Sequence, residues 1–553
     1  MSIQTTAGGM PVIILKEGTK ESKGKEAQKN NIAAAKLIAE IVRSSLGPRG
    51  MDKMLVDSLG DVTITNDGAT ILKEIDVQHP AAKMMVEVAK SVDAEVGDGT
   101  TSSVVFAGAL LEKAEDLINK DVHPSVVVDG YNAAADQALK LLEKIAINVD
   151  VADKDLLLKI TRTSMDSKLV SEDSPVLAQI VVDATRQVAE KTDGGLKVDL
   201  DDIKVEKKAG GSMRDTKLIK GIVLDKEVVH AGMPKRIDGA KIALVNSALE
   251  IEKTEMSAEI RISDPQQMQM FLEEENRMLK SMVDKLVGSG ANVVLCQKGI
   301  DDIAQHYLAK AGILAVRRVK ESDMTKMSRA TGARMVNNLD DLTSKDLGSA
   351  QLVEERKVET DKWVFIEGCK NPKAVTILVR GGSQRVVDEA DRSLHDALMV
   401  MKDVLEHPNI VAGGGAPEAY ISSELRQWAS SQEGRAQLAV QKFADALDQI
   451  PLSLAENAGM DPIDTMTELR SKQSKGAKWT GVDARNTTVT DMFKQNVLEP
   501  LVVKQQIIKS ATEVVSMLLR IDDVIASSKS KGPAGPPGGG MGGMGGMGGM
   551  DME

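Results

Sequence analysis

The chain has 553 residues and a formal net charge of −12, from 70 Lys+Arg against 82 Asp+Glu. Its length predicts several domains. Apolar residues make up 42% of the chain and aromatic residues only 2%, which favours packed helices and inner strands over an aromatic-rich β-sandwich. The acidic balance, with no basic stripe, argues against nucleic acid as a partner.

The cysteine content and the hydropathy of the chain indicate in which compartment the protein works. Neither Cys296 nor Cys369 lies in a CxxC motif, which argues against a disulfide framework or a zinc site. The N-terminus has no basic segment followed by an apolar one, and no stretch reaches about 18 uninterrupted apolar residues. We therefore expect a soluble, cytoplasmic protein with reduced cysteines and no membrane partner.

The first part of the chain is predicted to be mostly helical, with one β-hairpin. Apolar residues recur at helical spacing in three long stretches, and prolines and glycines mark several of their ends. Two short β-branched and apolar runs flank a turn and predict the hairpin. The expected helices cover about 27–45, 100–119 and 124–147, and the expected strands 12–15, 54–56 and 62–65.

The middle of the chain alternates apolar strands with helical patterns, which is typical of an α/β domain. A helical region is thus interrupted by an α/β insertion and then resumed. After Lys531 a Pro/Gly-rich tail with Gly-Gly-Met repeats is expected to be disordered. The expected strands are 242–245, 293–295, 313–319 and 375–379, and the expected helices 266–287, 301–310, 383–405, 417–458 with breaks, and 498–520.

The sharpest motif is Gly97-Asp98-Gly99-Thr100-Thr101-Ser102, at the start of the helix expected over 100–119. Glycines let a ligand approach the backbone, and free N–H groups with the helix dipole favour phosphate. Asp98 could hold a hard cation such as Mg²⁺, which bridges phosphate oxygens. Asp, Gly and Thr also suit an ordinary capped helix, so from the residues alone both interpretations stay open.

Three further features are ambiguous when taken alone. Asn66-Asp67-Gly68 lies between a strand and a helix and is a strong turn signal. Gly413-Gly414-Gly415 could cradle a phosphate or a sugar, or form a flexible loop. Asp396 lies opposite the apolar stripe of the helix expected over 383–405, so periodicity alone predicts a solvated surface carboxylate.

Several motifs in this order resemble the group II chaperonins, the family of the archaeal thermosome and its eukaryotic cytosolic relative. The resemblance covers nearly the whole chain, and the Gly-Gly-Met tail is most similar to that of archaeal thermosome subunits. One departure is Leu452, where the family usually has Arg after Ile-Pro. The motifs are Leu46–Gly50, Thr65–Thr70, His79–Lys83, Gly97–Ser102, Gly413–Gly415, Leu454–Gly459 and Asp461–Asp464.

The resemblance implies a multidomain fold and a double ring of like subunits, homo- or hetero-oligomeric, that encloses non-native protein clients. Its domains would be a mainly α-helical equatorial domain at 1–150 and 407–531, a small α/β intermediate domain at 151–222 and 370–406, and an α/β apical domain at 223–369 with a helical lid at about 246–279, followed by the disordered tail at 532–553. The strands 12–15, 54–65 and 521–525 would pair within and between neighbouring subunits.

Some apolar residues of the implied lid would stay exposed in the open ring and contact non-native chains. The alternative is that an amphipathic helix packs them inward. The residues concerned are Leu249, Ile251, Met256, Met268, Met270 and Phe271.

The resemblance also implies an ATPase that uses ATP and Mg²⁺. Asp98 would bind Mg²⁺, while Asp67 and Asp396 would orient the attacking water, with Asp396 preferred as the base once hinge closure carries it onto the ATP. Lys168 would sense the γ-phosphate. The other implied nucleotide contacts are Gly47, Pro48, Gly99, Thr100, Thr101, Ser102, Ser164, Gly414, Gly415, Asp483 and Glu499.

Two other classes of function compete with an ATP-hydrolysing folding chamber. A small-molecule phosphotransferase could use the same Asp and Gly-rich loops, but the chain has no kinase signature set. A structural ring without hydrolysis would not need Asp67, Asp98 and Asp396, and all three are present.

Overall fold

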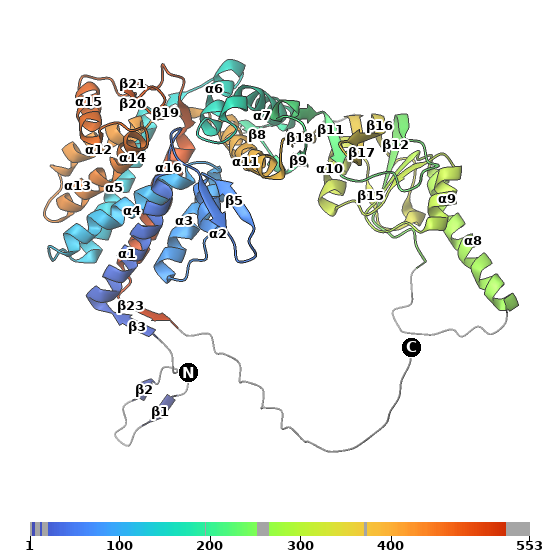
Figure 1. Cartoon of the computed structure of the whole chain (residues 1–553), viewed down its shortest axis with the longest axis horizontal. Helices are drawn as coiled ribbons and strands as arrows, with labels where there is room; N and C mark the ends of the chain where they lie inside the picture. The colour runs from blue at the N-terminus through green and yellow to red at the C-terminus, as the bar shows by residue number, and fades with distance from the viewer. Residues whose placement is uncertain are drawn as a thin grey trace, which may run out of the picture. The chain divides into compact units, whose positions relative to one another are not determined.

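The computed structural model describes residues 3–5, 11–13, 20–193, 195–251, 265–369 and 373–526 (Figure 1). The expected tail at 532–553 and Met256 of the expected lid lie outside the described residues. In the described part of the chain, no helix is both long and apolar enough to cross a membrane. Both cysteines are free and buried.

The chain divides into two compact units, residues 1–30 with 521–553, and residues 31–520. In the first unit, β1 (Ile3–Thr5) pairs with β2 (Pro11–Ile13), and β3 (Lys20–Lys23) pairs antiparallel with β23 (Asp523–Ala526). The expected strands at 12–15 and 521–525 are therefore present, each with shifted bounds. Since β3 and β23 come from opposite ends of the sequence, the two ends of the chain are joined by backbone hydrogen bonds.

The helical predictions for both ends of the chain are confirmed. Proline begins α5, as expected, and also α3, because its missing N–H has no partner in a first turn. The expected helix to 147 ends at Ile145, because Ile147 and Asn148 form a strand that pairs with β19. The helices are α1 (Gly24–Arg43), α2 (Gly68–Glu74), α3 (Pro80–Val96), α4 (Thr100–Ile118), α5 (Pro124–Ile145), α12 (Ala416–Ala429), α13 (Ala436–Leu447), α14 (Gln449–Asn457), α15 (Pro462–Ser474) and α16 (Leu501–Leu519).

Helix α4 is buried on almost every side, because its residues are small or apolar. It packs against α13 and α16 from the far end of the sequence. The Phe443 ring meets those of Phe106 and Tyr131 edge to face there. The distance between ring centroids is 5.4 Å to Phe106 and 5.7 Å to Tyr131. A short sheet in the order β22-β19-β6 joins the same parts of the chain, with β6 (Ile147–Asn148), β19 (Asn409–Ala412) and β22 (Leu498–Pro500). Two local pairs accompany it, β4 (Lys53–Val56) with β5 (Val62–Thr65) and β20 (Thr480–Asp483) with β21 (Thr488–Asp491).

The middle of the chain holds the predicted α/β insertion. A three-stranded sheet in the order β10-β18-β9 is covered by α7 and α11, and α6 packs against these two helices. Gly381 ends β18, and the Ser383 side chain caps α11 by accepting the Val386 N–H. The elements are α6 (Lys154–Met165), α7 (Ser174–Val188), the small β7 (Glu190–Thr192) and β8 (Gly195–Lys197) pair, β9 (Ile203–Ala209), β10 (Lys217–Ile219), β18 (Val375–Gly381) and α11 (Gln384–Glu406).

A seven-stranded mixed sheet follows the order β11-β17-β16-β12-β13-β14, with β15 also paired to β12. The expected strand 313–319 is shorter than predicted, because Arg318 adopts a positive φ of 55° and the chain turns there. The elements are β11 (Gly221–Leu224), β12 (Arg236–Val245), α8 (Pro265–Ser289), β13 (Val293–Cys296), α9 (Asp302–Lys310), β14 (Leu314–Val316), α10 (Glu321–Thr331), β15 (Met335–Val336), β16 (Gly348–Val358) and β17 (Asp361–Cys369).

The apolar residues of the expected lid divide into two groups. Met268, Met270 and Phe271, in the first turns of α8, are 55%, 70% and 47% exposed, as a contact surface requires. Leu249 is fully buried and its backbone bridges to Ile300. An exposed role for Leu249 is therefore wrong, because this residue belongs to the core beneath the sheet.

Close packing of α4 on α1 depends on one glycine. A Cβ at Gly108 would lie 2.3 Å from the Cβ of Ala39. We expect Gly108→Ala to lower the stability of the protein by about 1–3 kcal/mol, because the two helices must move apart. The measurement is the midpoint of thermal or denaturant unfolding. Gly288→Ala is the matched control, since Gly288 lies in α8 with nothing within 4 Å of an added Cβ; equal midpoints for the two variants would contradict the prediction.

Candidate active site

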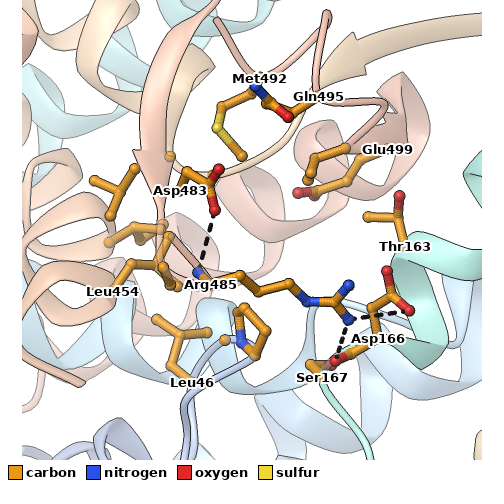
Figure 2. A pocket seen from close by; sticks show the side chains of 18 of the residues that line it. Leu46, Thr163, Asp166, Ser167, Leu454, Asp483, Arg485, Met492, Gln495 and Glu499 are labelled. Atoms are coloured by element: carbon orange, nitrogen blue, oxygen red, sulfur yellow. Dashed lines mark hydrogen bonds and ion pairs between the residues drawn. The ribbon is translucent and has the colours of Figure 1, made fainter. Parts of the chain in front are cut away.

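A cavity of about 330 Å³ gathers residues from widely separated parts of the sequence (Figure 2). Its walls come from the loop after α1, the start of α4, the loop after α6, the glycines before α12, and the segment from β20 to α16. The predicted site residues that line it are Gly47, Pro48, Asp98, Gly99, Ser102, Gly414, Gly415, Asp483 and Glu499.

Two helix N-termini open onto this cavity. Gly99 precedes α4 with φ 81°, and Gly415 precedes α12 with φ 72°. Within the described chain, no side chain accepts a hydrogen bond to cap either helix. The first N–H groups of α4 and the positive ends of both dipoles therefore remain available to an anion, whereas at α12 the Ala416 N–H already donates to the Gly413 carbonyl and Pro417 has no N–H. This observation favours phosphate binding over the ordinary capped helix that the motif also allowed.

Asp98 and Asp67 lie on either side of the start of α4. Asp98 lines the cavity, and its Oδ1 accepts the Gly99 N–H at 2.6 Å. Asp67 caps α2 by accepting the Thr70 N–H at 2.8 Å, and its other oxygen accepts the Thr100 hydroxyl at 3.2 Å. The turn predicted at Asn66-Asp67-Gly68 is thus present, and it also brings the Asp67 carboxylate to the phosphate motif.

The turn that carries Asp67 lies close to the start of α4, because the Gly68 backbone packs against Thr101. A Cβ at Gly68 would lie 2.6 Å from the Thr101 hydroxyl oxygen. The Asn66 side-chain amide also donates to the carbonyl of Ser167, in the loop after α6. Asp67, Thr100 and Thr101 therefore border the cavity-lining residues without being among them.

Asp396 is buried, so the surface position predicted from its periodicity is wrong. It is only 6% exposed, and it forms an ion pair with the equally buried Lys168. Periodicity failed because α11 is covered on that side too: a Cβ at Gly97 would lie 3.7 Å from the Asp396 Cα and against the Met399 side chain. The helix carrying Asp396 therefore lies directly against the turn that precedes Asp98.

Burial and neighbouring charges change the ionisation of this pair. Burial raises the pKa of Asp396 to about 6, although the Lys168 ammonium acts to lower it. Burial alone would lower the pKa of Lys168, but the carboxylates of Asp396, Asp98 and Asp67 raise it above its ordinary value. Asp396 is thus a carboxylate that can take up a proton near neutral pH, beside a lysine that stays charged.

Ser164 does not line the cavity. Its buried hydroxyl donates to the Thr161 carbonyl at 2.9 Å within α6. The neighbouring residues Thr163, Asp166 and Ser167 line the cavity instead. Figure 2 shows Arg485 reaching across it, with its guanidinium 3.1 Å from the Asp166 carboxylate.

Lys504 is a cavity residue that sequence reasoning missed. It is buried between Glu418 and Glu499, at 2.9 Å and 2.6 Å from their carboxylate oxygens. Burial acts to lower the pKa of Lys504 and to raise that of Glu499, yet the two carboxylates hold the lysine charged with a raised pKa. The signal that could have found it is a lone lysine inside the apolar run that begins α16.

The departure at Leu452 leaves the cavity intact. Ile450 lines it, and a Cβ at Gly415 would lie 2.8 Å from the Cβ of Pro451. The Ile-Pro pair thus supports the glycine loop, while Leu452 itself is not among the lining residues.

We expect Lys504→Met to lower the free energy of unfolding by about 3–5 kcal/mol, because two buried carboxylates lose their cation. Chemical denaturation of the assembled protein measures it. Adding Glu418→Gln to Lys504→Met should recover part of the loss, since one buried charge is removed. A single variant as stable as the parent would contradict the charge pairing.

Comparison with known proteins places the chain in a family. The model of the TCP-1/cpn60 chaperonin family matches residues 38–529. The chain is 59% identical to thermosome subunit alpha of Archaeoglobus fulgidus, over 96% of this chain and 97% of that one. It is 58% identical to thermosome subunit beta of Thermococcus kodakarensis, over 94% and 95%.

A solved structure agrees. The open-state monomer of a group II chaperonin from Methanococcoides burtonii matches with a TM-score of 0.59 and 44% identity, over 77% of this chain and all of that one. This chain therefore belongs to the TCP-1/cpn60 chaperonin family, as a group II chaperonin subunit, and is an ATP-dependent chaperone that forms ring chambers.

Proposed function

We propose that the cavity binds ATP with Mg²⁺, and that the subunit hydrolyses this ATP to drive the folding of non-native proteins enclosed in the chamber. The observation that supports it most is that the N-termini of α4 and α12, neither with a side-chain cap, and the Asp98 carboxylate all border one cavity. Two such N-termini suit a chain of phosphates better than a single anion.

Each residue of the cavity contacts a different part of the nucleotide in this proposal. Gly99, Thr100, Thr101 and Ser102 hold phosphate oxygens, and Asp98 holds Mg²⁺, a cation that prefers carboxylate and phosphate oxygens. Gly47, Pro48, Gly414 and Gly415 form the walls around the nucleotide. Asp483 and Glu499 face the ribose or adenine, and Lys504 keeps Glu499 charged and in place. Ser164, whose hydroxyl donates inside α6, supports the end of the helix that carries the cavity-lining Thr163 and Asp166.

Asp396 and Asp67 orient the attacking water, with Asp396 as the base. The raised pKa of Asp396 suits a group that takes a proton near neutral pH. Lys168 responds to the γ-phosphate, because a phosphate beside it offers a second anionic partner in competition with Asp396. Since α11 and the Gly97 turn belong to different proposed domains, hinge closure sets the distance between base and nucleotide.

We propose the domain boundaries as predicted, with equatorial parts at 1–150 and 407–531, intermediate parts at 151–222 and 370–406, and an apical domain at 223–369. The lid at 246–279 would use the exposed Met268, Met270 and Phe271 for clients. The β4–β5 hairpin, whose Met54 and Leu59 are exposed, would contact a neighbouring subunit in a double ring of like chains. Two free, buried cysteines suit the cytoplasm as its compartment.

The alternatives weighed from the sequence receive less support. A small-molecule phosphotransferase does not agree with membership of the chaperonin family across residues 38–529. A ring without hydrolysis would not need the grouping of Asp67, Asp98 and Asp396, whose charges act on one another and on Lys168.

Asp98→Ala is expected to abolish Mg²⁺-dependent phosphate release, because the cation and the phosphates lose their shared carboxylate. The measurement is phosphate release with Mg²⁺ and with chelator. Asp136→Ala, at an exposed position of α5, is the control. Turnover of the Asp98 variant at the parent's rate would refute the assignment of the metal ligand.

Asp396→Asn is expected to leave ATP affinity within about twofold and to slow hydrolysis by roughly 10²-fold or more, because the base is lost while the shape is kept. Binding is measured by titration with ATP, and hydrolysis by single turnover. Asp391→Asn, on the same helix, is the control. Equal losses of binding and hydrolysis would show that Asp396 is not the base.

A further inference from the structure

His395 is the neighbour of Asp396 that connects this buried carboxylate to solvent. The Asp396 side chain is 8% exposed, whereas the adjacent His395 side chain is 57% exposed. The His395 Nδ1 lies 3.5 Å from the Asp396 Oδ1. Asp396 therefore meets an exposed, titratable ring on one oxygen and a buried lysine on the other.

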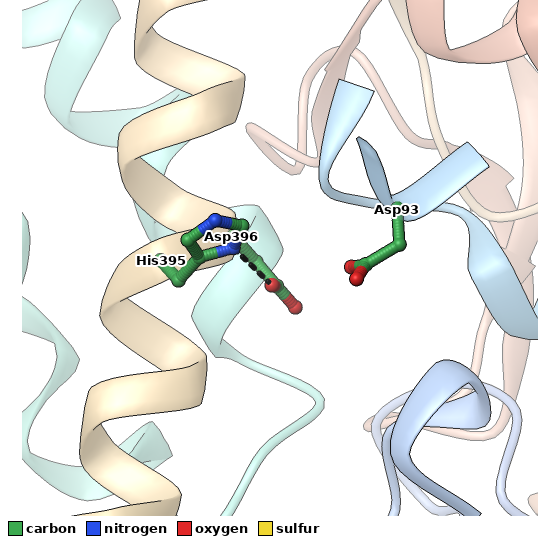
Figure 3. A group of neighbouring side chains, drawn as sticks. All are labelled: Asp93, His395 and Asp396. Atoms are coloured by element: carbon green, nitrogen blue, oxygen red, sulfur yellow. Dashed lines mark ion pairs between the residues drawn. The ribbon is translucent and has the colours of Figure 1, made fainter. Parts of the chain in front are cut away.

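Asp93 approaches the same group from α3. One carboxylate oxygen of Asp93, one ring nitrogen of His395 and one oxygen of Asp396 all lie within 4.8 Å of one another. Figure 3 shows the Asp93 carboxylate pointing across the space between the helices toward Asp396. An imidazole carrying an extra proton would thus lie near two carboxylates, one from α11 and one from α3.

Proton balance requires an outlet at this position. When the attacking water forms its bond to the γ-phosphorus and the bond to the ADP oxygen breaks, one water proton passes to Asp396. The Lys168 ammonium has no lone pair and cannot accept it. Asp396 is nearly closed to water, so the proton cannot leave directly. Of the two described residues that form an ion pair with Asp396, Lys168 is buried and His395 is the one that reaches solvent.

We propose that His395 is a proton-relay and positioning residue for the base Asp396. The proton on Asp396 passes to the Nδ1 lone pair of a neutral ring that carries its own proton on Nε2, and the resulting Nδ1–H donates to the regenerated carboxylate. The exposed imidazolium then releases the Nδ1 proton to bulk water, which restores the Nε2–H tautomer for the next turnover. Asp93 steadies the ring while it is charged. This inference rests on the proposed role of Asp396 as the base.

The surrounding charges agree with transfer in this direction. His395 is faced by Asp396, Asp93 and Lys168, and its hydrogen bond to Asp396 raises its pKa above the ordinary value of 6.5. Asp396 is faced by Lys168, His395, Asp67 and Asp98, and burial raises its pKa to about 6. The hydrogen bond and the two carboxylates thus favour a protonated imidazole beside Asp396.

The test compares His395→Asn and His395→Ala with the parent chain in single-turnover ATP hydrolysis, which separates chemistry from slower conformational steps. Asn keeps a hydrogen-bond donor near the position of Nδ1 but cannot relay a proton. We expect it to bind ATP within about twofold of the parent and to hydrolyse it roughly tenfold to a hundredfold more slowly. His407→Ala, at the end of the same helix, should keep the parent's rate.

Two readouts separate a relay from a merely structural role. Imidazole added to His395→Ala should restore much of the rate, because it can occupy the space and carry the proton. The acid limb of the pH–rate profile of His395→Ala should move to higher pH. The reason is that the imidazole hydrogen bond acts to lower the pKa of Asp396, so its loss requires a higher pH to ionise the base.

Parent-like hydrolysis by His395→Asn, or a His395→Ala variant that imidazole leaves unchanged, would overturn the relay. If Asp396→Asn is slow while His395→Asn is normal, the relay fails and Asp396 remains the base. If Asp396→Asn hydrolyses ATP at the parent's rate, the proposed base fails first. Ring assembly of each variant, followed by native electrophoresis, ensures that the rates compare folded proteins.

Discussion

The buried ion pair of Lys168 with Asp396 is the contact on which the candidate site depends. It joins side chains 228 positions apart in the sequence. Removing two charges from water costs several kcal/mol per ion, and such a pair is stable only when its geometry and further charges compensate. Asp67 and Asp98 supply that compensation for the lysine. The pair thereby joins α11 to the loop after α6, while the packing of Met399 on Gly97 holds the proposed base beside the Gly97–Ser102 motif.

That arrangement requires backbones to approach closely, and the composition of the chain allows it. Gly97 meets Met399, Gly108 meets Ala39, and Gly130 meets Ala439, each at a distance that a further carbon would close. With aromatic residues at 2% of the sequence, small and flexible side chains fill the space between helices. Small and flexible side chains define a single packing arrangement less well than aromatic rings do. The many helix contacts and a few aromatic residues such as Phe443 compensate for this.

Local elements could be predicted well from the sequence, whereas the burial of side chains by distant segments could not. Helix α4, the β4–β5 hairpin and the glycine loops follow from periodicity and turn chemistry, which act within a few residues. The long β16–β17 pair was missed, because Glu354 and Arg356 interrupt its apolar alternation. Both form ion pairs across the sheet, Glu354 with Arg236 of β12 and Arg356 with Glu367 of β17. Asp396 and Lys504 were misjudged or missed because their burial depends on segments hundreds of residues away.

The distribution of the cavity walls has a consequence for how the protein is made. Leu46 and Lys504 both line it, and α16 packs between α3, α4 and α5. Synthesis proceeds from the N-terminus, and segments begin to fold as they emerge. The wall containing Glu499 and Lys504 does not exist until nearly the whole chain has left the ribosome. An unfinished subunit therefore lacks a complete nucleotide cavity, and only a finished chain can enter the ATP cycle.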